Sequence, residues 1–410
     1  MRASLAKLPL LEHATIMVKA CEFDAASFAQ QRAELKAAMR WSQMRAPSIV
    51  YPRLHDSLVC DIDKVRPARH WPDLPSKQNQ SDFTYDRRKH GREQKRALLK
   101  RILGAEYPEF DVVSEFAEMA ADPDRRFGNL GQKLAVLRFD GNDFGKVGDR
   151  CITPELSLKF SQTTQEQQEE FFRKLISGNA AWWTNDYPPK LRLEIVVYGG
   201  DEGTFITPAW LGWKALKAFY EHVQASPPLE LPGQSQPLTY SAGLVFCHEK
   251  APIHAIKKLA SGLCDQAKDR AKEEHEAKGN FAVYQALESF DAIGEDLDDF
   301  LRRRYLFTKG RGVYLGIGEV ALLEDNMNYW RETLSRRRLH ALARTLEGGK
   351  APKEIEKYLE YVEKEVRNLV DSKSPGSENA VAQVNALRGR LGDAALLHIL
   401  ELWDYAGVQL

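Results

Sequence analysis

The chain is 410 residues long, which allows two or three domains with a sizeable hydrophobic core. Its 58 Lys and Arg residues balance 58 Asp and Glu residues, so a net charge of zero gives no general attraction to nucleic acid. The five cysteines form no Cys-X-X-Cys pair, which argues against a disulfide framework or a structural zinc site, and no apolar stretch approaches ~18 residues. We therefore expect a cytoplasmic protein with no membrane span. Because Glu12 and His13 interrupt the apolar run near the N-terminus, we also expect no cleaved signal peptide.

Residues 1–128 form the first predicted region, an α/β segment that contains a strongly basic stretch. The pattern predicts a strand at Ala14–Lys19, a helix at Ala25–Trp41 and a proline-rich, polar loop at Arg66–Asp86. The basic stretch, Asp86–Arg101, has eight Lys or Arg among sixteen residues. Such a run is usually a solvated helix face, and the alternative is a surface that binds RNA or DNA phosphates.

Residues 129–288 form the second predicted region, in which strand and helix patterns alternate. The predicted elements are a strand at Leu134–Phe139, a helix at Gln165–Trp182, strands at Leu193–Tyr198 and Thr204–Thr207, a helix at Leu211–Val223, a strand at Thr239–Phe246, a helix at Ile253–Glu274 and a strand at Phe281–Tyr284. Their β-α-β-β-α-β order, with an added helix and strand, is typical of the ferredoxin-like fold. In that fold the first strand lies beside the following hairpin, as in the palm of many polymerases and nucleotide cyclases.

Residues 289–410 form the third predicted region, which is almost wholly helical. Apolar residues recur at helical spacing in Leu297–Tyr305, Tyr329–Leu346, Lys353–Val370 and Ala380–Tyr405, with a loop at Ser372–Asn379. The predicted fold class is therefore α+β, with a ferredoxin-like palm (βαββαβ) between an N-terminal α/β region and a C-terminal helical domain.

Two strands of the central region end at carboxylates. The run Leu134–Phe139 leads into Asp140, and the next strand leads into Gly199-Gly200-Asp201-Glu202. Two acidic strand ends side by side suit a two-metal phosphoryl-transfer site, since Mg²⁺ prefers one or two carboxylates together with phosphate oxygens. We expect Asp140 and Asp201, with the backbone of Gly141, to bind Mg²⁺ or Mn²⁺. We expect Glu202 to be a further ligand or to orient a metal-bound water.

Other residues of the same two loops are candidates for binding a nucleoside triphosphate. Gly199-Gly200 allow positive φ and a close approach of the backbone to phosphate or base. Gly141 allows the loop with Asn142 to present backbone amides to phosphate oxygens, and Lys146 is positioned to contact the triphosphate. Phe144 directly follows the metal loop, a position that supports packing and stacking on a base equally.

These motifs resemble those of a known superfamily. FDGNDFGK and YGGDE are similar to the two motifs of GGDEF-type palm domains. They are most similar to the cyclase/polymerase palm of the large subunit of type III CRISPR effector complexes, which has a DGDNxGK-like loop and a GGDD hairpin. Two further blocks follow in the same order. The segment YSAGLVFCHEKAPIHAIKKLASGLCDQAKDRAK resembles the family's strand-to-helix block, and Lys278-Gly279-Asn280 resembles the turn after that helix.

The resemblance implies an activity and a set of partners. It implies Mg²⁺-dependent condensation of ATP, or GTP, into a cyclic nucleotide or cyclic oligonucleotide signal in antiviral defence. It also implies that Lys268 contacts the triphosphate, with Lys272, one helical turn further on, as the alternative. The expected partners are nucleoside triphosphates, a second copy of the chain that places two palms face to face, and RNA or other CRISPR-type subunits.

The chain departs from the family's pattern at several positions, and other interpretations stay open. The hairpin has Gly-Gly-Asp-Glu where the family usually has two Asp, and the first loop has Gly-Asn-Asp where Gly-Asp-Asn is common. The His55-Asp56 dipeptide lacks the surroundings of the nuclease domain often fused to that subunit. We therefore expect a smaller, stand-alone relative. The alternatives are an RNA-binding effector subunit, a catalytically silent nucleotide-binding palm, and a diguanylate cyclase, against which Gly203 argues because Phe would stand there.

Overall fold

The computed structural model of the chain describes residues 18–22, 24–45, 58–74, 78–104, 109–177, 179–273, 279–287, 297–304, 312–347, 355–369 and 377–410. The chain divides into two compact units, which we call the N-terminal unit, 1–107 with 147–160, and the main unit, 108–146 with 161–410. The domain boundaries expected at 128/129 and 288/289 stay predictions.

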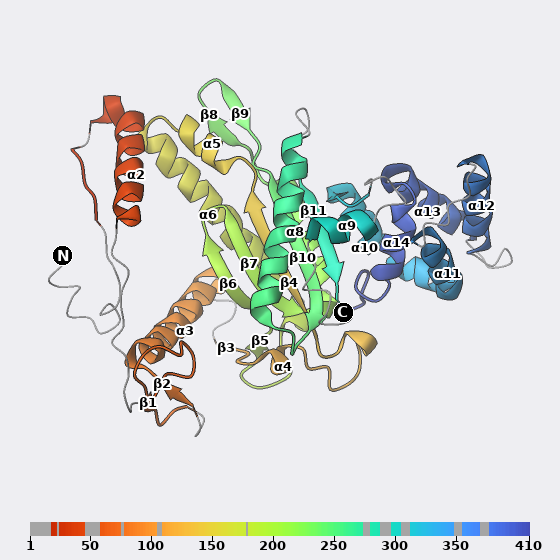
Figure 1. Cartoon of the computed structure of the whole chain (residues 1–410), viewed down its shortest axis with the longest axis horizontal. Coiled ribbons are helices and arrows are strands. Elements are labelled where there is room, and N and C mark those ends of the chain that lie inside the picture. Colours follow the sequence, from red (N-terminus) through yellow and green to blue (C-terminus); the bar gives the residue numbers. More distant parts are fainter. Residues whose placement is uncertain are drawn as a thin grey trace. The chain divides into compact units, whose positions relative to one another are not determined.

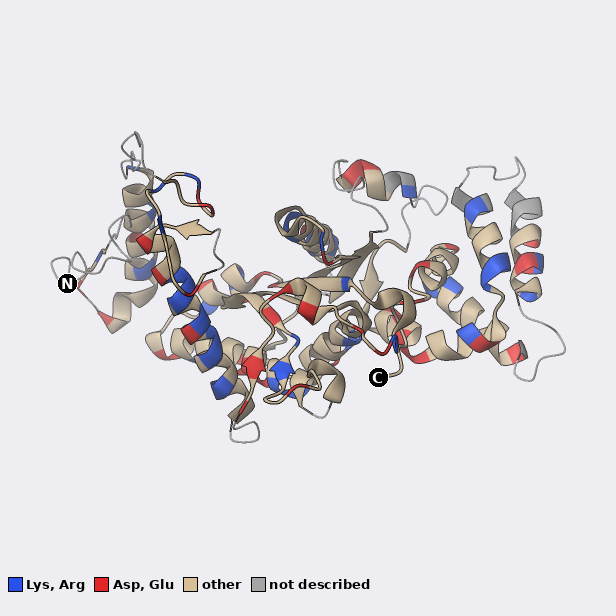
Figure 2. Ribbon diagram, turned by 90° about the horizontal axis from the view of Figure 1, so that it is seen from below, with Lys and Arg blue, Asp and Glu red and all other residues tan. Residues whose placement is uncertain are grey.

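The N-terminal unit places the basic stretch on one long helix. Its elements are the short helix η2 (Ala25–Ser27), α2 (Phe28–Met44), the antiparallel strands β1 (Arg69–His70) and β2 (Asn79–Gln80), and α3 (Asp82–Leu103). The Ser81 hydroxyl accepts a hydrogen bond from the Thr84 amide at the start of α3, and Gly104 ends the helix with a φ of 65°. Figure 2 shows Lys and Arg following one another along α3.

Two predictions for this unit need comment. The loop expected at Arg66–Asp86 is wrong in part, because β1, β2 and the first turn of α3 fall within it. The Trp71 ring stacks on Tyr85 with ring centroids 3.6 Å apart, and its indole N–H donates to the Gln80 carbonyl, so one aromatic residue orders the proline-rich segment. Of the strand expected at Ala14–Lys19, residues 14–17 lie outside the described residues, and Val18 and Lys19 belong to no strand.

The main unit is built on a mixed six-stranded sheet with the order β12-β11-β10-β4-β7-β6. The strands β10, β4, β7 and β6 pair antiparallel with one another in that order, and β6 forms one edge of the sheet. On the other side β11 pairs parallel with β10, and β12 pairs antiparallel with β11. This is the strand order of the ferredoxin-like fold, so the predicted α+β palm is confirmed. The strands are β4 (Lys133–Gly141), β6 (Glu194–Gly199), β7 (Glu202–Pro208), β10 (Tyr240–His248), β11 (Phe281–Ala286) and β12 (Leu315–Gly316).

Helices cover both faces of this sheet, and the alternation of β4 assigns each of its side chains to one face (Figure 1). Phe139 packs with Phe171 of α6 (Pro154–Ile176) and Phe219 of α7 (Ala209–Ala225). Leu134 and Val136 belong to a core cluster on the opposite face, with apolar residues of α8 (Ile253–Glu273). Residues two apart on a strand share a face, so Arg138 and Asp140 lie on the same face of β4 as Val136. Asp140 therefore faces α8.

A glycine on the neighbouring strand makes room for the ring of Phe139. Gly203 of β7 pairs with Phe139 in the ladder, and a Cβ on Gly203 would lie 2.2 Å from the ring atom Cζ. Phe139 is itself fully buried, so the ring has no other space to occupy. The pair of positions 139 and 203 therefore has room for one large side chain, which is Phe139 of β4.

The C-terminal helices pack on the palm as part of the same main unit. Among the described residues these are α9 (Leu297–Arg304), α10 (Ile317–Thr333), α11 (Arg336–Glu347), α12 (Ile355–Asn368), α13 (Ser377–Leu391) and α14 (Ala394–Glu401). The Trp213 indole of α7 donates to the Val320 carbonyl of α10, and the Tyr405 ring lies 4.2 Å from the ring of Phe246. Helical character is confirmed for this region.

Two of the expected helices are each divided in two. Tyr329–Leu346 is interrupted because Leu334 is extended and the Ser335 amide donates to the Leu369 carbonyl instead of to its own helix. Ala380–Tyr405 is interrupted at Gly392, which ends α13 with a φ of 63°. The loop expected at Ser372–Asn379 lies outside the described residues up to 376, and α13 begins at Ser377.

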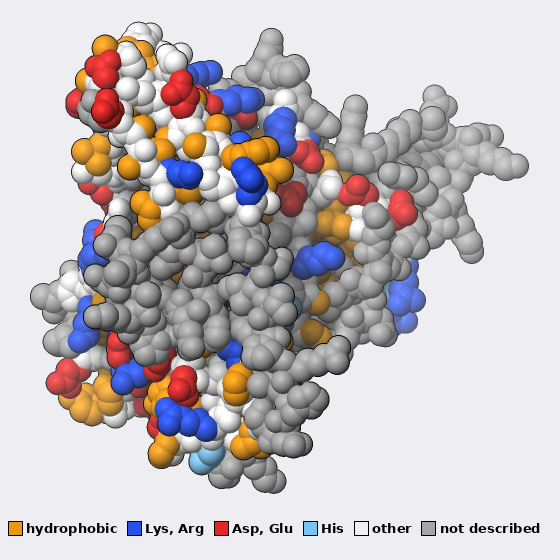
Figure 3. Space-filling view, turned by 60° about the vertical axis from the view of Figure 1, so that its left-hand side comes forward, with side chains coloured by type: hydrophobic (Ala, Val, Ile, Leu, Met, Phe, Trp, Pro, Cys, Tyr) orange, Lys and Arg blue, Asp and Glu red, His pale blue; other side chains and the backbone are white. Residues whose placement is uncertain are grey.

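The described surface matches the balanced composition of the chain. Figure 3 shows acidic, basic and hydrophobic side chains intermixed on the described part of the face that it presents. None of the described helices is long and apolar enough to cross a membrane.

Candidate active site

The two acidic motifs meet at one edge of the palm sheet. Asp140 on β4 pairs directly with Glu202 on β7, and the Gly141 amide donates a hydrogen bond of 2.9 Å to the Asp201 carbonyl. Asp140 lies within the strand rather than after it, since β4 extends to Gly141. The carboxylates expected to act together are thus neighbours in the structure, although 61 positions separate Asp140 from Asp201.

The hairpin that carries Asp201 depends on its two glycines. Gly199 pairs with Glu202, so Gly200 and Asp201 form a two-residue turn. Gly199 has a φ of 146° and Gly200 a φ of 61°, both in regions that favour glycine. The Gln168 side chain of α6, which is buried, donates to the Gly200 carbonyl over 2.8 Å and to the Glu202 carbonyl over 3.4 Å. The turn is therefore fixed from outside the hairpin.

A lysine of α8 reaches the acidic edge. The Nζ atom of Lys268 lies 2.5 Å from Oδ1 of Asp140, and both side chains are largely buried. Lys272, the alternative, is exposed and pairs with Asp269 on its own helix at 2.7 Å. That hydrogen bond raises the pKa of Lys272, and the charges of Asp269, Asp143 and Asp265 add to the effect. Only Lys268 of the two contacts a candidate metal ligand.

Arg138 holds Glu202 on the same face of the sheet. Its Nη2 atom lies 2.6 Å from Oε2 of Glu202 and 3.9 Å from Oδ2 of Asp140, and Nη1 donates to the Thr204 hydroxyl. Burial lowers the pKa of the Arg138 guanidinium, and the bond to Glu202 outweighs this and raises it. Glu202 is thereby oriented and its charge balanced before any ligand binds.

The loop after Asp140 is fastened to the start of β10 and to the turn before β11. The Asn142 amide donates to the Thr239 carbonyl, its side-chain amide donates to the Gly279 carbonyl, and its side-chain oxygen accepts from the Ser241 hydroxyl. The Asn280 side chain in turn accepts a hydrogen bond from the Tyr240 amide over 2.7 Å. Asn142 therefore shapes the loop, and Gly279 and Asn280 belong to the same network. Lys278 lies outside the described residues, as does the His55-Asp56 dipeptide.

The remaining candidates differ in how open they are to a ligand. Phe144 is 5% exposed, and its ring fills the space beside Gly141, where a Cβ would lie 2.3 Å from it. It also lies 5.1 Å from the ring of Tyr240, so the structure favours the packing role over stacking on a base. Lys146 is exposed and pairs with Asp143 at 3.0 Å.

The electrostatics of the edge favour a bound cation. Burial raises the pKa of the Asp201 carboxyl, and the negative charges of Asp140 and Glu202 raise it further against the opposing effects of its own backbone amide and Lys268. Negative charge is thus crowded at a half-buried position, where a divalent ion would relieve the repulsion.

The donor set suits magnesium although it is small. Among the described residues, no group of three or more His, Cys, Asp and Glu side chains is arranged to hold a metal ion. Mg²⁺ needs only one or two protein carboxylates when substrate phosphates and water complete its octahedron. Asp140 and Asp201, at adjoining positions of one edge, are the two carboxylates that would hold such an ion.

Some residues that shape this edge were not predicted from the sequence. Arg138 carried a signal, since a charged residue inside an apolar strand requires a partner. Ser241 stood within the quoted Ser-Ala-Gly motif without a role. Gln168 carried no signal, because a glutamine in a glutamine-rich helix gives no indication that it is buried.

The fold and this edge define the central region of the protein as a palm domain with the nucleotide cyclase/polymerase fold. Residues 133–277 match the sequence model of the Cas10/Cmr2 second palm domain, which confirms the resemblance expected from the motifs. No curated protein matches the chain.

Several solved structures match the chain at low similarity. Csm1 of T. onnurineus is 13% identical with a TM-score of 0.42, over 73% of this chain and 41% of that one. A Csm1–Csm4 cassette in complex with AMPPNP is 17% identical with a TM-score of 0.38, over 71% and 38%. The GGDEF domain of FimX from Pseudomonas aeruginosa is 13% identical with a TM-score of 0.27, over 38% and 84%. The chain therefore spans well under half of the Csm1 chains that it matches.

Proposed function

We propose that this protein is a divalent-metal-dependent nucleotidyltransferase that condenses nucleoside triphosphates, ATP or GTP, into a cyclic nucleotide or cyclic oligonucleotide. The observation that carries the proposal is the pairing of Asp140 with Glu202 beside the Asp201 turn, with Lys268 bound to Asp140. The match of residues 133–277 to a Cas10/Cmr2 palm supports the same class of reaction. A role in antiviral defence, in the cytoplasm, is part of the proposal.

The reaction transfers a nucleotidyl group. A ribose hydroxyl of one nucleotide attacks the α-phosphorus of a second, a new P–O bond forms, the bond to the β-phosphate breaks, and pyrophosphate leaves as the hydroxyl loses its proton. Mg²⁺ or Mn²⁺ held by Asp140, Asp201 and the backbone of Gly141 would supply charge neutralisation for the triphosphate and acidify the attacking hydroxyl.

The chain's own residues then have separate roles. Lys268 would contact the triphosphate in place of Asp140, and Arg138 keeps Glu202 directed at the edge. The backbone at Gly199 and Gly200 has open space on its side-chain side, where a Cβ would meet no atom within 4 Å, so a phosphate or base can approach it. A second copy of the chain would bring the other nucleotide, because the attacking hydroxyl of a second nucleotide must also be positioned.

The test is product analysis with matched carboxylate variants. The protein is incubated with ATP, with GTP and with both, in Mg²⁺, with and without phage-derived nucleic acid, and the products are identified by mass spectrometry. Asp140→Asn and Asp201→Asn should abolish pyrophosphate release and product, whereas Asp149→Asn, an exposed carboxylate of the N-terminal unit, should not. Product formation at the wild-type rate in both edge variants would sink the proposal. Mg²⁺-dependent binding of an ATP analogue without turnover would instead indicate the silent palm.

A second candidate function, an RNA-binding subunit of a CRISPR-type assembly, is supported by helix α3. A cavity of about 530 Å³ beside this helix is lined by Tyr85 and by basic residues that include Arg88, Lys89 and Arg92. Burial lowers the pKa of Arg88 and the like charge of Arg92 lowers it further, whereas Asp73, which also lines the cavity, opposes both effects. Such crowding of cations is relieved by phosphates.

This candidate is tested by binding of single-stranded RNA at several salt concentrations. Replacing Arg88, Lys89 and Arg92 by Gln should weaken binding and flatten its salt dependence, because fewer counterions are released. A control that removes three exposed charges outside α3, Lys159→Gln with Lys250→Gln and Lys258→Gln, should leave the affinity and its salt dependence unchanged. Equal effects of the two sets would exclude a dedicated surface on α3.

A further inference from the structure

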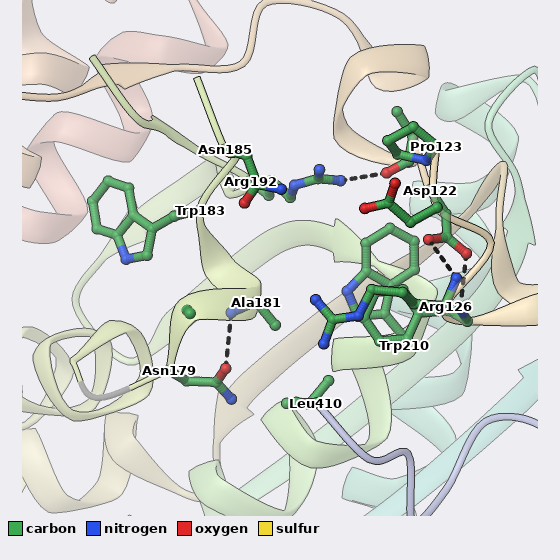
Figure 4. Close-up of a pocket in the computed structure, with 14 residues that line it drawn as sticks. Asp122, Pro123, Arg126, Asn179, Ala181, Trp183, Asn185, Arg192, Trp210 and Leu410 are labelled. Atoms are coloured by element: carbon green, nitrogen blue, oxygen red, sulfur yellow. Dashed lines mark hydrogen bonds between the residues drawn. The ribbon is translucent and has the colours of Figure 1, made fainter. Parts of the chain in front are cut away.

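A second cavity lies at the end of the palm sheet opposite the acidic edge (Figure 4). Arg192, just before β6, and Trp210, just after β7, line it, whereas Asp140, Gly199 and Glu202 mark the other ends of these strands and of β4. At about 3.3 Å per residue, the nine residues of β4 separate the two ends by roughly 25 Å or more. The cavity has a volume of about 450 Å³, within the range of small-molecule sites.

Trp210 brings to this cavity a hydrogen-bond donor without a partner. Its side chain is 2% exposed, and Nε1 finds no acceptor among the described residues. Phe127 stacks on the indole at 4.5 Å, and the guanidinium of Arg192 lies 5.6 Å from its centroid, so the ring itself is well packed. A buried N–H left unpaired destabilises the folded state unless a ligand or water accepts from it.

Two arginines and two asparagines add further donors. Arg192 uses Nη1 on the carbonyls of Met119 and Ala121, and burial lowers the pKa of its guanidinium. Arg126 is exposed at the cavity, with its guanidinium 5.5 Å from the ring of Phe127. Figure 4 shows Arg126 and Trp210 on one side of the cavity and Asn179 on the other, where its oxygen is already bound to the Ala181 amide. The side-chain amide of Asn179 then remains as a donor group, as does that of the exposed Asn185.

The carboxylates that line the cavity are hydrogen-bonded to the backbone or exposed to solvent. Asp122 accepts hydrogen bonds from the backbone amides of Arg126 and Phe127, one at each carboxylate oxygen. Asp124 also lines the cavity but is exposed to solvent. Donor groups thus lie on both sides of the cavity beside these two carboxylates, and they favour a ligand that carries several acceptors. An arginine fork and an indole N–H suit phosphate oxygens.

The volume and the aromatic lining of the cavity indicate that a bound phosphate would be part of a larger ligand with a flat ring. A phosphate group alone fills a small part of about 450 Å³. The half-buried ring of Trp183 lines the side opposite Trp210 and Arg126 (Figure 4). Flat aromatic surfaces of this kind stack nucleobases without strong preference among them. From these features we propose that the cavity binds a mononucleotide, with its phosphate at Arg126 and Trp210 and its base toward Trp183, independently of the acidic edge.

The experiment is calorimetric titration of the full chain with AMP in EDTA, so that no divalent ion supports binding at the acidic edge. Inorganic phosphate and adenosine are titrated in parallel. AMP should bind, and Arg126→Gln and Trp210→Phe should each weaken it at least about tenfold, since each removes one hydrogen bond to a charged group. Arg125→Gln, the exposed neighbour outside the cavity, and Asp201→Asn should leave the affinity unchanged.

Each contrary result has a distinct meaning. Absence of AMP binding in EDTA, or binding that neither cavity variant weakens, would overturn the site. Loss of binding in Asp201→Asn would assign it to the acidic edge. Phosphate bound as tightly as AMP would overturn the base contact. Because Arg126 is exposed, Arg126→Gln tests the site even where Trp210→Phe unfolds the chain.

Discussion

The ammonium group of Lys268 lies 2.5 Å from Oδ1 of Asp140, so helix α8 supplies the cation that balances a candidate metal ligand on strand β4. Both side chains are largely buried, which strengthens their attraction relative to an exposed pair. If Asp140 holds the proposed metal ion, this ammonium group would become available to a triphosphate. Lys268 is therefore expected to change partner during the reaction cycle.

Lys268→Met should raise the KM for the triphosphate at least about tenfold, because a hydrogen bond between charged groups is worth roughly 1.5–3 kcal/mol. Lys272→Met is the matched control on the same helix, and its loss of an exposed pair with Asp269 should have little effect. Steady-state kinetics over a range of ATP concentrations measures both. An equal rise in KM for the two variants would contradict the separate role of Lys268.

Asp201→Asn should lower product formation about 100-fold or more while raising the melting temperature. The activity falls because a group that stabilises charge in the transition state is lost. The stability rises at neutral pH because the raised pKa of Asp201 means that its charged form is disfavoured in the folded state, and Asn removes that charge. Thermal unfolding without metal tests the predicted rise in melting temperature. A lower melting temperature would show that Asp201 stabilises the hairpin.

Product formation should fall as the pH decreases, and the midpoint of this fall should lie above the pKa of an ordinary aspartate. Metal binding requires the ionised carboxylate, and burial with the charges of Asp140 and Glu202 raises the pKa of Asp201. Because Mg²⁺ and protons compete for this group, a higher Mg²⁺ concentration should move the acid limb to lower pH. Rates measured against pH at two Mg²⁺ concentrations test this. An acid limb that Mg²⁺ does not move would assign the titration to another group.

The main unit should lose stability between about pH 6.5 and pH 4 through His398. Burial lowers the pKa of this histidine to about 4, and its ring nitrogens bond the Gly312 carbonyl and the Tyr284 hydroxyl. Below its unfolded pKa of 6.5 the unfolded chain binds a proton that the folded chain excludes, which costs on the order of 3 kcal/mol by pH 4. Urea unfolding at several pH values measures the loss. His398→Gln should reduce the pH dependence in this window, and an unchanged slope would contradict the assignment.

Gly203→Ala should destabilise the main unit by about 1–3 kcal/mol, since its Cβ would lie 2.2 Å from the ring of Phe139 in a packed core. Gly145→Ala is the control, because a Cβ there meets nothing within 4 Å and alanine favours the helix in which it lies. Denaturant midpoints of the two variants should move in opposite directions. Equal stability of both variants would mean that Phe139 relocates at no cost.

The sequence predicted the palm because its elements are long and regular, and the neighbours of Asp140 followed from the strand order. Lys268 was found through a resemblance, since no spacing links position 268 to position 140. The bond from Arg138 to Glu202 requires the register of β4 against β7, which the pattern alone does not provide. The break between α10 and α11 depends on the Leu369 carbonyl, a tertiary contact, and tertiary contacts override helical periodicity.

The ring of Phe139 beside Gly203 has a consequence for comparing this chain with its relatives. The volume that a phenylalanine after Gly-Gly-Asp-Glu would need on that face is already filled from the adjacent strand. Position 203 taken alone would therefore suggest that a large side chain is missing from this face. Positions 139 and 203 taken together show that the large side chain stands on β4 instead of β7. In an alignment of relatives, residues at 139 and 203 should covary, with a small side chain at one wherever the other is large.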